Sequence, residues 1–147
     1  MATKTASEKS DLSVHLSEHP NVTRTRDGFD AFGRGDLDAV HASFTDTATW
    51  TNAGTSAIAG THSGWDEIVK MFGTLLEVTG GTFVMDVKAI LADDERSVTI
   101  YDATSTINGK TATERFCLID DLTPEGKITA TQVIAYDQAA ADAHFSG

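Results

Sequence analysis

Residues 101–116 read YDATSTINGKTATERF, and this stretch indicates how the C-terminal half of the chain folds. At its centre, Asn108-Gly109 separates two polar-rich arms, and both residues tolerate the positive φ of a type I′ turn. The stretch therefore predicts a β-hairpin. Counting outward from the turn places Asp102 opposite Arg115, so that a carboxylate and a guanidinium lie side by side on one face of a sheet.

This hairpin is expected to form the middle of a four-stranded antiparallel meander. After Gly80-Gly81 the apolar residues recur with a period of two, which is typical of strands. The turns between the strands are expected at ADDER, INGK and TPEG. The predicted strands cover residues 82–92, 96–106, 111–121 and 127–137.

The residues before the meander predict three helices and one strand. Apolar residues recur at helical spacing over 22–33, Asp36 caps a short second helix, and a wide apolar stripe marks a third helix over 65–78. The alternating segment 47–52 predicts a strand, and the Gly-rich segment after it a loop. This order of elements indicates an α+β fold with helices on one face of a bent sheet.

The bulk composition limits the kinds of protein this chain can be. With 147 residues, 40% of them hydrophobic, it is long enough for one domain and too short for two. The formal charge of −11 disfavours binding to nucleic acid or to an anionic membrane surface. One cysteine, Cys117, excludes an internal disulfide, and no Cys/His spacing resembles a zinc site. We therefore expect no metal.

The first twenty residues differ in composition from the rest. Residues 1–20 are rich in Ser, Thr, Glu and Lys, so we interpret them as a flexible N-terminal arm and residues 21–147 as a single domain. The arm has no apolar run that could serve as a signal peptide, and no stretch reaches membrane-spanning length. We expect a cytoplasmic protein with no membrane partner.

The alternation of apolar residues in the first meander strand predicts which face of the hairpin packs against the helices. There the apolar residues Phe83, Met85 and Val87 alternate with more polar ones, and the same parity continues to Leu91. Carried across the turns, this parity puts the following residues on the inner face: Asp102, Arg115, Cys117, Gln132, Ile134 and Tyr136. Tyr101 then points outward. The Asp102/Arg115 pair has two interpretations, a structural ion pair at the open end of the sheet or a pair that orients a ligand in a cavity.

Several segments resemble one protein family. They are AFGRGDLDAV before FTDTATWTNAG, then GTHSGWDEIVKMF and finally EGKITATQVIAYD. Over residues 22–137 the chain resembles SnoaL-like or ketosteroid-isomerase-like members of the nuclear-transport-factor-two-like superfamily. The resemblance implies a cone-shaped, curved mixed or antiparallel sheet wrapped around three N-terminal helices, a cystatin-like α+β roll. It also implies a deep apolar pocket and a homodimer built on the outer face of the sheet.

The resemblance matches known catalytic patterns only in part. Where ketosteroid isomerases carry a proton-shuttling carboxylate, this sequence has Asn52, and an amide cannot act as a general base. Limonene-epoxide-hydrolase-like proteins use an Asp–Arg–Asp set; Asp102 falls at one of these carboxylates, but Ile100 stands where the arginine is expected. His62, after the Gly-rich loop, lies where the resemblance implies the pocket mouth, and it is either an acid–base group or an exposed loop residue.

These observations give two hypotheses for function. The first is a cofactor-free acid–base isomerase, cyclase or hydrolase acting on a small hydrophobic, oxygenated molecule, with Asp102, Arg115 and His62 as catalytic candidates. The second is a non-catalytic dimeric module that binds a ligand or a protein. The residues expected to contact the ligand are Trp50, Asn52, Phe72, Met85, Cys117, Gln132 and Tyr136.

Overall fold

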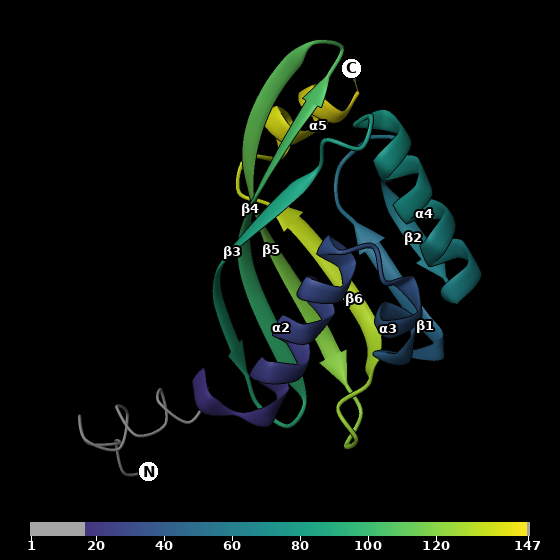
Figure 1. Ribbon diagram of the computed structural model, residues 1–147, viewed down its shortest axis with the longest axis vertical. Coiled ribbons are helices and arrows are strands. Elements are labelled where there is room, and N and C mark those ends of the chain that lie inside the picture. Colours follow the sequence, from purple (N-terminus) through teal and green to yellow (C-terminus); the bar gives the residue numbers. More distant parts are fainter. Residues whose placement is uncertain (1–16, 147) are drawn as a thin grey trace, which may run out of the picture.

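The computed structural model describes residues 17–146, which form a layer of helices against a curved sheet (Figure 1). The helices are α2 (Pro20–Gly33), α3 (Leu37–Ala42), α4 (Trp65–Val78) and α5 (Gln138–Phe145). The strands are β1 (Phe44–Asn52), β2 (Gly60–Ser63), β3 (Val84–Ala92), β4 (Arg96–Ile107), β5 (Lys110–Leu122) and β6 (Ile128–Ala135). Most of the expected N-terminal arm, residues 1–16, lies outside the described residues.

The sheet has six strands in the order β2-β1-β6-β5-β4-β3. Neighbouring strands are antiparallel except β1 and β6, which run parallel, so the sheet is mixed. The predicted α+β class and the four-stranded meander are confirmed. The strand β2 and the helix α5 were not predicted.

The hairpin predicted from the opening stretch is also confirmed. Asn108 and Gly109 have φ values of 51° and 78°, as a type I′ turn requires, and Asp102 pairs with Arg115 across β4 and β5. The register of the two arms therefore follows from the turn, as the sequence predicts.

The predicted choice of inner face, in contrast, is wrong. In β3, Val87 pairs with Tyr101 and Ala89 pairs with Ile100, so Lys88 is an extra residue, a β-bulge that changes the parity of the strand. Before the bulge the odd-numbered residues of β3 face inward, and after it Ile90 and Ala92 are the buried ones. The buried residues of β4 are therefore Ser97, Thr99, Tyr101, Ala103, Ser105 and Ile107. Asp102 faces outward.

The helices cover the inner face of the sheet and bury their apolar stripes against it. Helix α4 buries Ile68, Met71, Phe72 and Leu75, as its predicted stripe requires. Helix α5 is capped by the Asp137 carboxylate, which accepts a hydrogen bond from the Ala140 amide at 3.0 Å. Within residues 17–146, no helix is long and apolar enough to cross a membrane.

Candidate functional site

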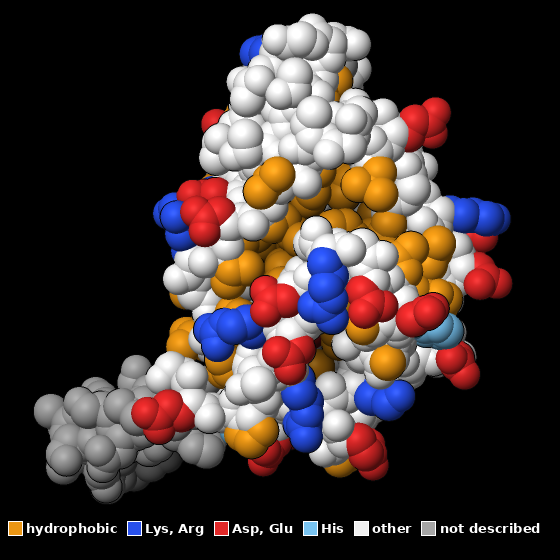
Figure 2. All heavy atoms as spheres, viewed as in Figure 1, with side chains coloured by type: hydrophobic (Ala, Val, Ile, Leu, Met, Phe, Trp, Pro, Cys, Tyr) orange, Lys and Arg blue, Asp and Glu red, His pale blue; other side chains and the backbone are white. Residues whose placement is uncertain are grey.

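A cavity of about 130 Å³ lies between the helices and the inner face of the sheet. Figure 2 shows hydrophobic side chains lining a hollow in the surface between α2 and α4. An apolar cavity of about 150 Å³ in another protein holds a benzene molecule, so this one has room for about one ring. The aromatic side chains that line it are Phe29, Phe32, Phe44, Trp50, Phe72, Phe83, Tyr101, Phe116 and Phe145.

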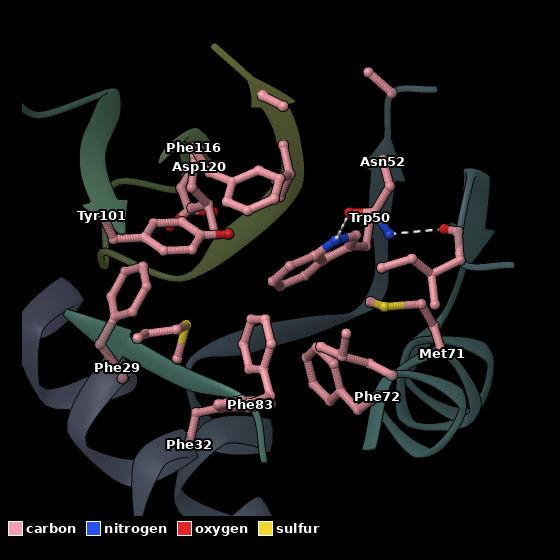
Figure 3. A pocket seen from close by; sticks show the side chains of 18 of the residues that line it. Phe29, Phe32, Trp50, Asn52, Met71, Phe72, Phe83, Tyr101, Phe116 and Asp120 are labelled. Atoms are coloured by element: carbon pink, nitrogen blue, oxygen red, sulfur yellow. Dashed lines mark hydrogen bonds between the residues drawn. The ribbon is translucent and has the colours of Figure 1, made fainter. Parts of the chain in front are cut away.

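The rings of the lining hold one another in place. Phe72 makes edge-to-face contacts with Trp50 and Phe32, at centroid distances of 5.2 and 5.0 Å. On the sheet side, Tyr101 stacks on Phe116 at 5.5 Å. Because these rings come from α2, α4 and three strands, the shape of the cavity depends on the whole fold (Figure 3).

Asp120 is the buried acid of the cavity. It lies on the inner face of β5, is only 4% exposed, and accepts a hydrogen bond from the Thr131 hydroxyl at 2.5 Å. Burial raises the pKa of its carboxyl to about 7; the nearby Asp121 charge adds to this rise, and the Thr131 hydrogen bond opposes it. Within residues 17–146, no cationic side chain offsets the burial, so Asp120 exchanges its proton near neutral pH.

Tyr101 lies on the same side of the cavity as Asp120 (Figure 3). Its side chain is 5% exposed, and Figure 3 shows no hydrogen bond between its hydroxyl and the side chains drawn around the cavity. Burial raises the pKa of the phenol, and the charges of Cys117 and Asp120 raise it further. Tyr101 therefore keeps its proton and can donate a hydrogen bond to an oxygen atom in the cavity.

Asn52 and His62 hold the segment between β1 and β2. The Asn52 side chain accepts a hydrogen bond from Trp50 Nε1 at 2.8 Å and donates one to the Ile58 carbonyl at 2.8 Å. His62 Nε2 donates to the same carbonyl at 2.9 Å. Since Ile58 lines the cavity, these hydrogen bonds shape one of its walls.

Helix α5 fastens the same segment from its other side. The Asp142 carboxylate accepts hydrogen bonds from the Thr55 amide and the Gln138 side chain, both at 3.1 Å. Gly54 has a φ of +95°, and a Cβ there would overlap Asp142 and Gln138. Asp142 is thus a second carboxylate that lines the cavity, but one with hydrogen-bond partners already in place.

The structure brings only some of the predicted site residues to the cavity. Trp50, Asn52, Phe72 and Met85 line it. The predicted inward orientation of the others is wrong, because the outer face of the sheet carries Asp102, Arg115, Cys117, Gln132 and Tyr136. His62, expected at the pocket mouth, lies on the edge strand β2 and contacts the carbonyl of Ile58, which lines the cavity.

The Asp102/Arg115 pair is an ion pair between neighbouring strands on this outer face. Arg115 donates two hydrogen bonds to the Asp102 carboxylate, at 2.7 and 3.1 Å, and its guanidinium lies 5.9 Å from the centre of the Tyr136 ring. The Arg115 hydrogen bonds lower the pKa of Asp102. This arrangement corresponds to the structural interpretation of the pair.

Sequence reasoning missed Asp120 and Tyr101, because both have the parity that was assigned to the outer face. One signal was present: Tyr101 and Phe116 are large aromatic residues that face each other across the hairpin. Within residues 17–146, no group of three or more His, Cys, Asp or Glu side chains is arranged to hold a metal ion.

Comparisons with known proteins identify similar sequences and structures. Residues 25–131 match the family described as SnoaL-like domain. Among solved structures, Bal32a from a soil-derived mobile gene cassette is 30% identical, with a TM-score of 0.80, and the match covers 85% of this chain and 95% of that chain. No curated protein sequence matches this chain.

Two more distant structures share the fold. A putative SnoaL-like polyketide cyclase from Jannaschia sp. CCS1 is 13% identical, with a TM-score of 0.74, over 100% of this chain and 99% of that one. TerC, which was co-crystallised with polyporic acid, is 19% identical, with a TM-score of 0.77, over 87% of this chain and 99% of that one. At these identities the likeness concerns the fold alone.

Proposed function

Because the chain belongs to the SnoaL-like domain family, we propose that its cavity binds a small hydrophobic, oxygenated molecule and moves a proton on it. The observation that carries this proposal is the buried Asp120 carboxyl, which has no cationic partner among the described residues and lies in an otherwise mainly apolar cavity near the Tyr101 hydroxyl. Burial of a carboxyl without a cationic partner is energetically unfavourable, and carboxyls whose pKa is raised in this way cluster at functional sites.

The two groups are suited to proton transfer next to a carbonyl. Asp120 exchanges its proton at about pH 7, so it can accept a proton from a carbon beside a carbonyl and return it to the same or another carbon. As the C–H bond breaks, its electron pair moves toward the carbonyl oxygen. Tyr101, which keeps its proton, donates a hydrogen bond to that developing negative charge. Thr131 orients Asp120 through its own hydroxyl.

Hydrogen exchange tests this chemistry without knowledge of the natural substrate. A panel of hydrophobic ketones and lactones is incubated with the protein in D₂O, and loss of the proton next to the carbonyl is followed by NMR. We expect exchange on at least one member of the panel, abolished in Asp120→Asn and slowed by about 10²-fold in Tyr101→Phe. Polyporic acid, with which TerC was co-crystallised, is included among the compounds tested for binding by thermal melting.

The matched control is Asp121→Asn, because Asp121 carries the same charge on the outer face of the same strand, where Arg96 contacts it at 3.4 Å. The Asp121 charge is the smallest contribution to the pKa of Asp120, so this variant should keep proton exchange to within about threefold of the unchanged protein. Exchange that persists in Asp120→Asn would overturn the role of Asp120.

The alternative is a binding module without catalysis. It is favoured by the Asn52 amide, whose hydrogen bonds go to Trp50 and Ile58 and so serve the cavity wall. Thermal melting against the same panel separates the two functions, because a ligand at 100 times its dissociation constant stabilises by about 2.7 kcal/mol. A ligand that stabilises the protein but exchanges no proton would favour the binding module.

A second copy of the chain is the partner we infer for the outer face of the sheet. This face leaves large apolar side chains exposed, with Leu91 at 47%, Ile134 at 44% and Tyr136 at 64%. The half-buried Ile100 and Ile119 lie between them in the sheet, so the apolar surface continues across four strands. Apolar surface of this kind favours association.

A further inference from the structure

We propose that the same cavity also accepts a hydrophobic ammonium ion, with the Asp120 carboxylate as its counter-ion. The inference rests on the proposed ligand site but not on the proposed proton transfer. It gives the cavity a preference for the charge of its ligand: organic cations above neutral molecules of the same shape, and neutral molecules above anions.

The first observation is the missing partner of Asp120. Its neighbours across the strands are Ser97 on β4 and Thr131 on β6, which offer hydroxyl groups and no charge. The titratable group facing it in the cavity is Tyr101, which stays neutral. A buried carboxylate without a cation is unfavourable, and an ammonium group in the cavity would supply that cation.

The other charged groups that line the cavity do not provide a cationic partner for Asp120. Arg24, at the α2 side, donates a hydrogen bond from Nη1 to Asn21 Oδ1 at 2.6 Å and does not enter the balance of charges that sets the pKa of Asp120. Asp142, from α5, adds a second negative charge to the lining, and Asp121 lies beyond Asp120 on the outer face. Asp121 is therefore the charged side chain that acts on the pKa of Asp120, and neither Arg24 nor Asp142 contributes to it.

The second observation is the aromatic lining. The faces of aromatic rings attract cations, tryptophan most strongly, and desolvated ammonium ions bind well in cages of such rings. Trp50, Phe29 and Phe116 line the same cavity as Asp120, together with the polarisable thioethers of Met71 and Met85. The lining thus offers an ammonium ion both a counter-ion and π-faces, while its apolar part takes up the hydrocarbon group.

The third observation is the charge of the whole chain. A formal charge of −11 gives the protein a negative potential that concentrates cations at its surface and repels anions. This acts in the same direction as the local charges. An anionic ligand would meet unfavourable charge both at the surface and beside Asp120.

Binding of an ammonium ion is linked to the proton of Asp120. The cation favours the carboxylate, so below about pH 7 binding must release the proton that Asp120 holds in the empty cavity. Affinity for an amine should therefore rise as pH approaches 8. It should fall only near pH 10, where an alkylammonium loses its own proton.

Three probes of one shape test the charge preference. They are 2-phenylethylamine, 2-phenylethanol and 3-phenylpropanoate, titrated calorimetrically into the full chain at pH 8. We expect the amine to bind about tenfold more tightly than the alcohol, and the carboxylate most weakly. At pH 6, titrations in two buffers of different ionisation enthalpy should show release of about one proton per bound amine.

Two variants assign the preference to its residue. Asp120→Asn should bring the amine and the alcohol to within about threefold of each other and abolish proton release. Asp121→Asn removes only a minor contribution to the pKa of Asp120, so it should keep most of the preference for the amine and a measurable proton release at pH 6. An amine that binds no more tightly than the alcohol overturns the inference while leaving the proposed function in place, since the alcohol still binds. A preference that survives in Asp120→Asn overturns it as well. If none of the three binds, and no ketone does, the proposed ligand site fails together with this inference.

Discussion

The Asp120 carboxyl couples the stability of the fold to pH. Its pKa is about 7 in the folded chain and about 3.9 in an unfolded one, so the folded state binds its proton more tightly. The stabilisation from this proton is complete below about pH 4 and is lost as pH rises through about 7. Over three pKa units, at about 1.4 kcal/mol each, this amounts to roughly 4 kcal/mol.

Asp120→Asn removes this titration, so it should gain stability relative to the unchanged protein as pH rises. Urea unfolding of both proteins at pH 4 and pH 8 measures the difference in the free energy of unfolding between them. We expect this difference to move in favour of Asp120→Asn by roughly 4 kcal/mol between the two pH values. Asp121→Asn controls for the change in net charge. A shift in the opposite direction would mean that a cation stabilises the Asp120 carboxylate in the fold.

At the scale of elements, the sequence predicts what local chemistry determines. The Asn108-Gly109 turn and its register depend on two residues with positive φ. Helix α4 depends on an apolar stripe that extends over several turns. By contrast, α5 carries the sequence QAAADAHF, whose alanines give no marked apolar face. Its periodicity therefore does not predict a helix, and the helix is recognised only from its packing in the structure.

The candidate site was less predictable than the fold, because it depends on which alternate residues of each strand face the helices. Nothing in the segment around Lys88 distinguishes a bulge from a regular strand, yet this one extra residue reverses the inner and outer faces of all later strands. Trp50 on β1 and Phe72 on α4 do not depend on that count, and both side chains line the cavity. For this reason the sequence predicts Asp102 on the inner face of the sheet and Asp120 on the outer face, and the structure shows the reverse.

Deletion of Lys88 tests the bulge. Without Lys88, a regular ladder keeps Val87 opposite Tyr101 and Ala89 opposite Ile100, so both ends of β3 retain their buried faces. We expect the variant to fold at a cost of about 1 kcal/mol in the free energy of unfolding, measured in urea.

The matched control is deletion of Asp86, which shortens the same edge strand by one residue. A regular ladder then places Lys88 inside in the position of Val87, at a cost of about 3 kcal/mol or more for a buried, unpaired charge. Equal losses from the two deletions would contradict the assignment of Lys88 as the extra residue.

At the scale of the whole molecule, the sheet separates two surfaces for which we propose different functions. Its inner face carries the cavity and the buried Asp120, and its outer face carries the Asp102/Arg115 pair among exposed apolar side chains. A second copy of the chain on the outer face would leave the opening between α2 and α4 free. Because each chain carries a formal charge of −11, such a pair must overcome mutual repulsion, and apolar contact is the available driving force.

Ile134→Arg tests this arrangement. Ile134 is 44% exposed on β6 and faces outward, so arginine there should leave the folded chain intact while placing a charge in the proposed contact. We expect sedimentation velocity to give a dimer for the unchanged protein and a monomer for the variant, with similar urea unfolding of the separated chains. Leu76→Arg is the matched control, since Leu76 is 46% exposed on α4 and the same charge is added away from the sheet. A dimer that persists in Ile134→Arg, or a monomer in the unchanged protein, would contradict pairing through this face.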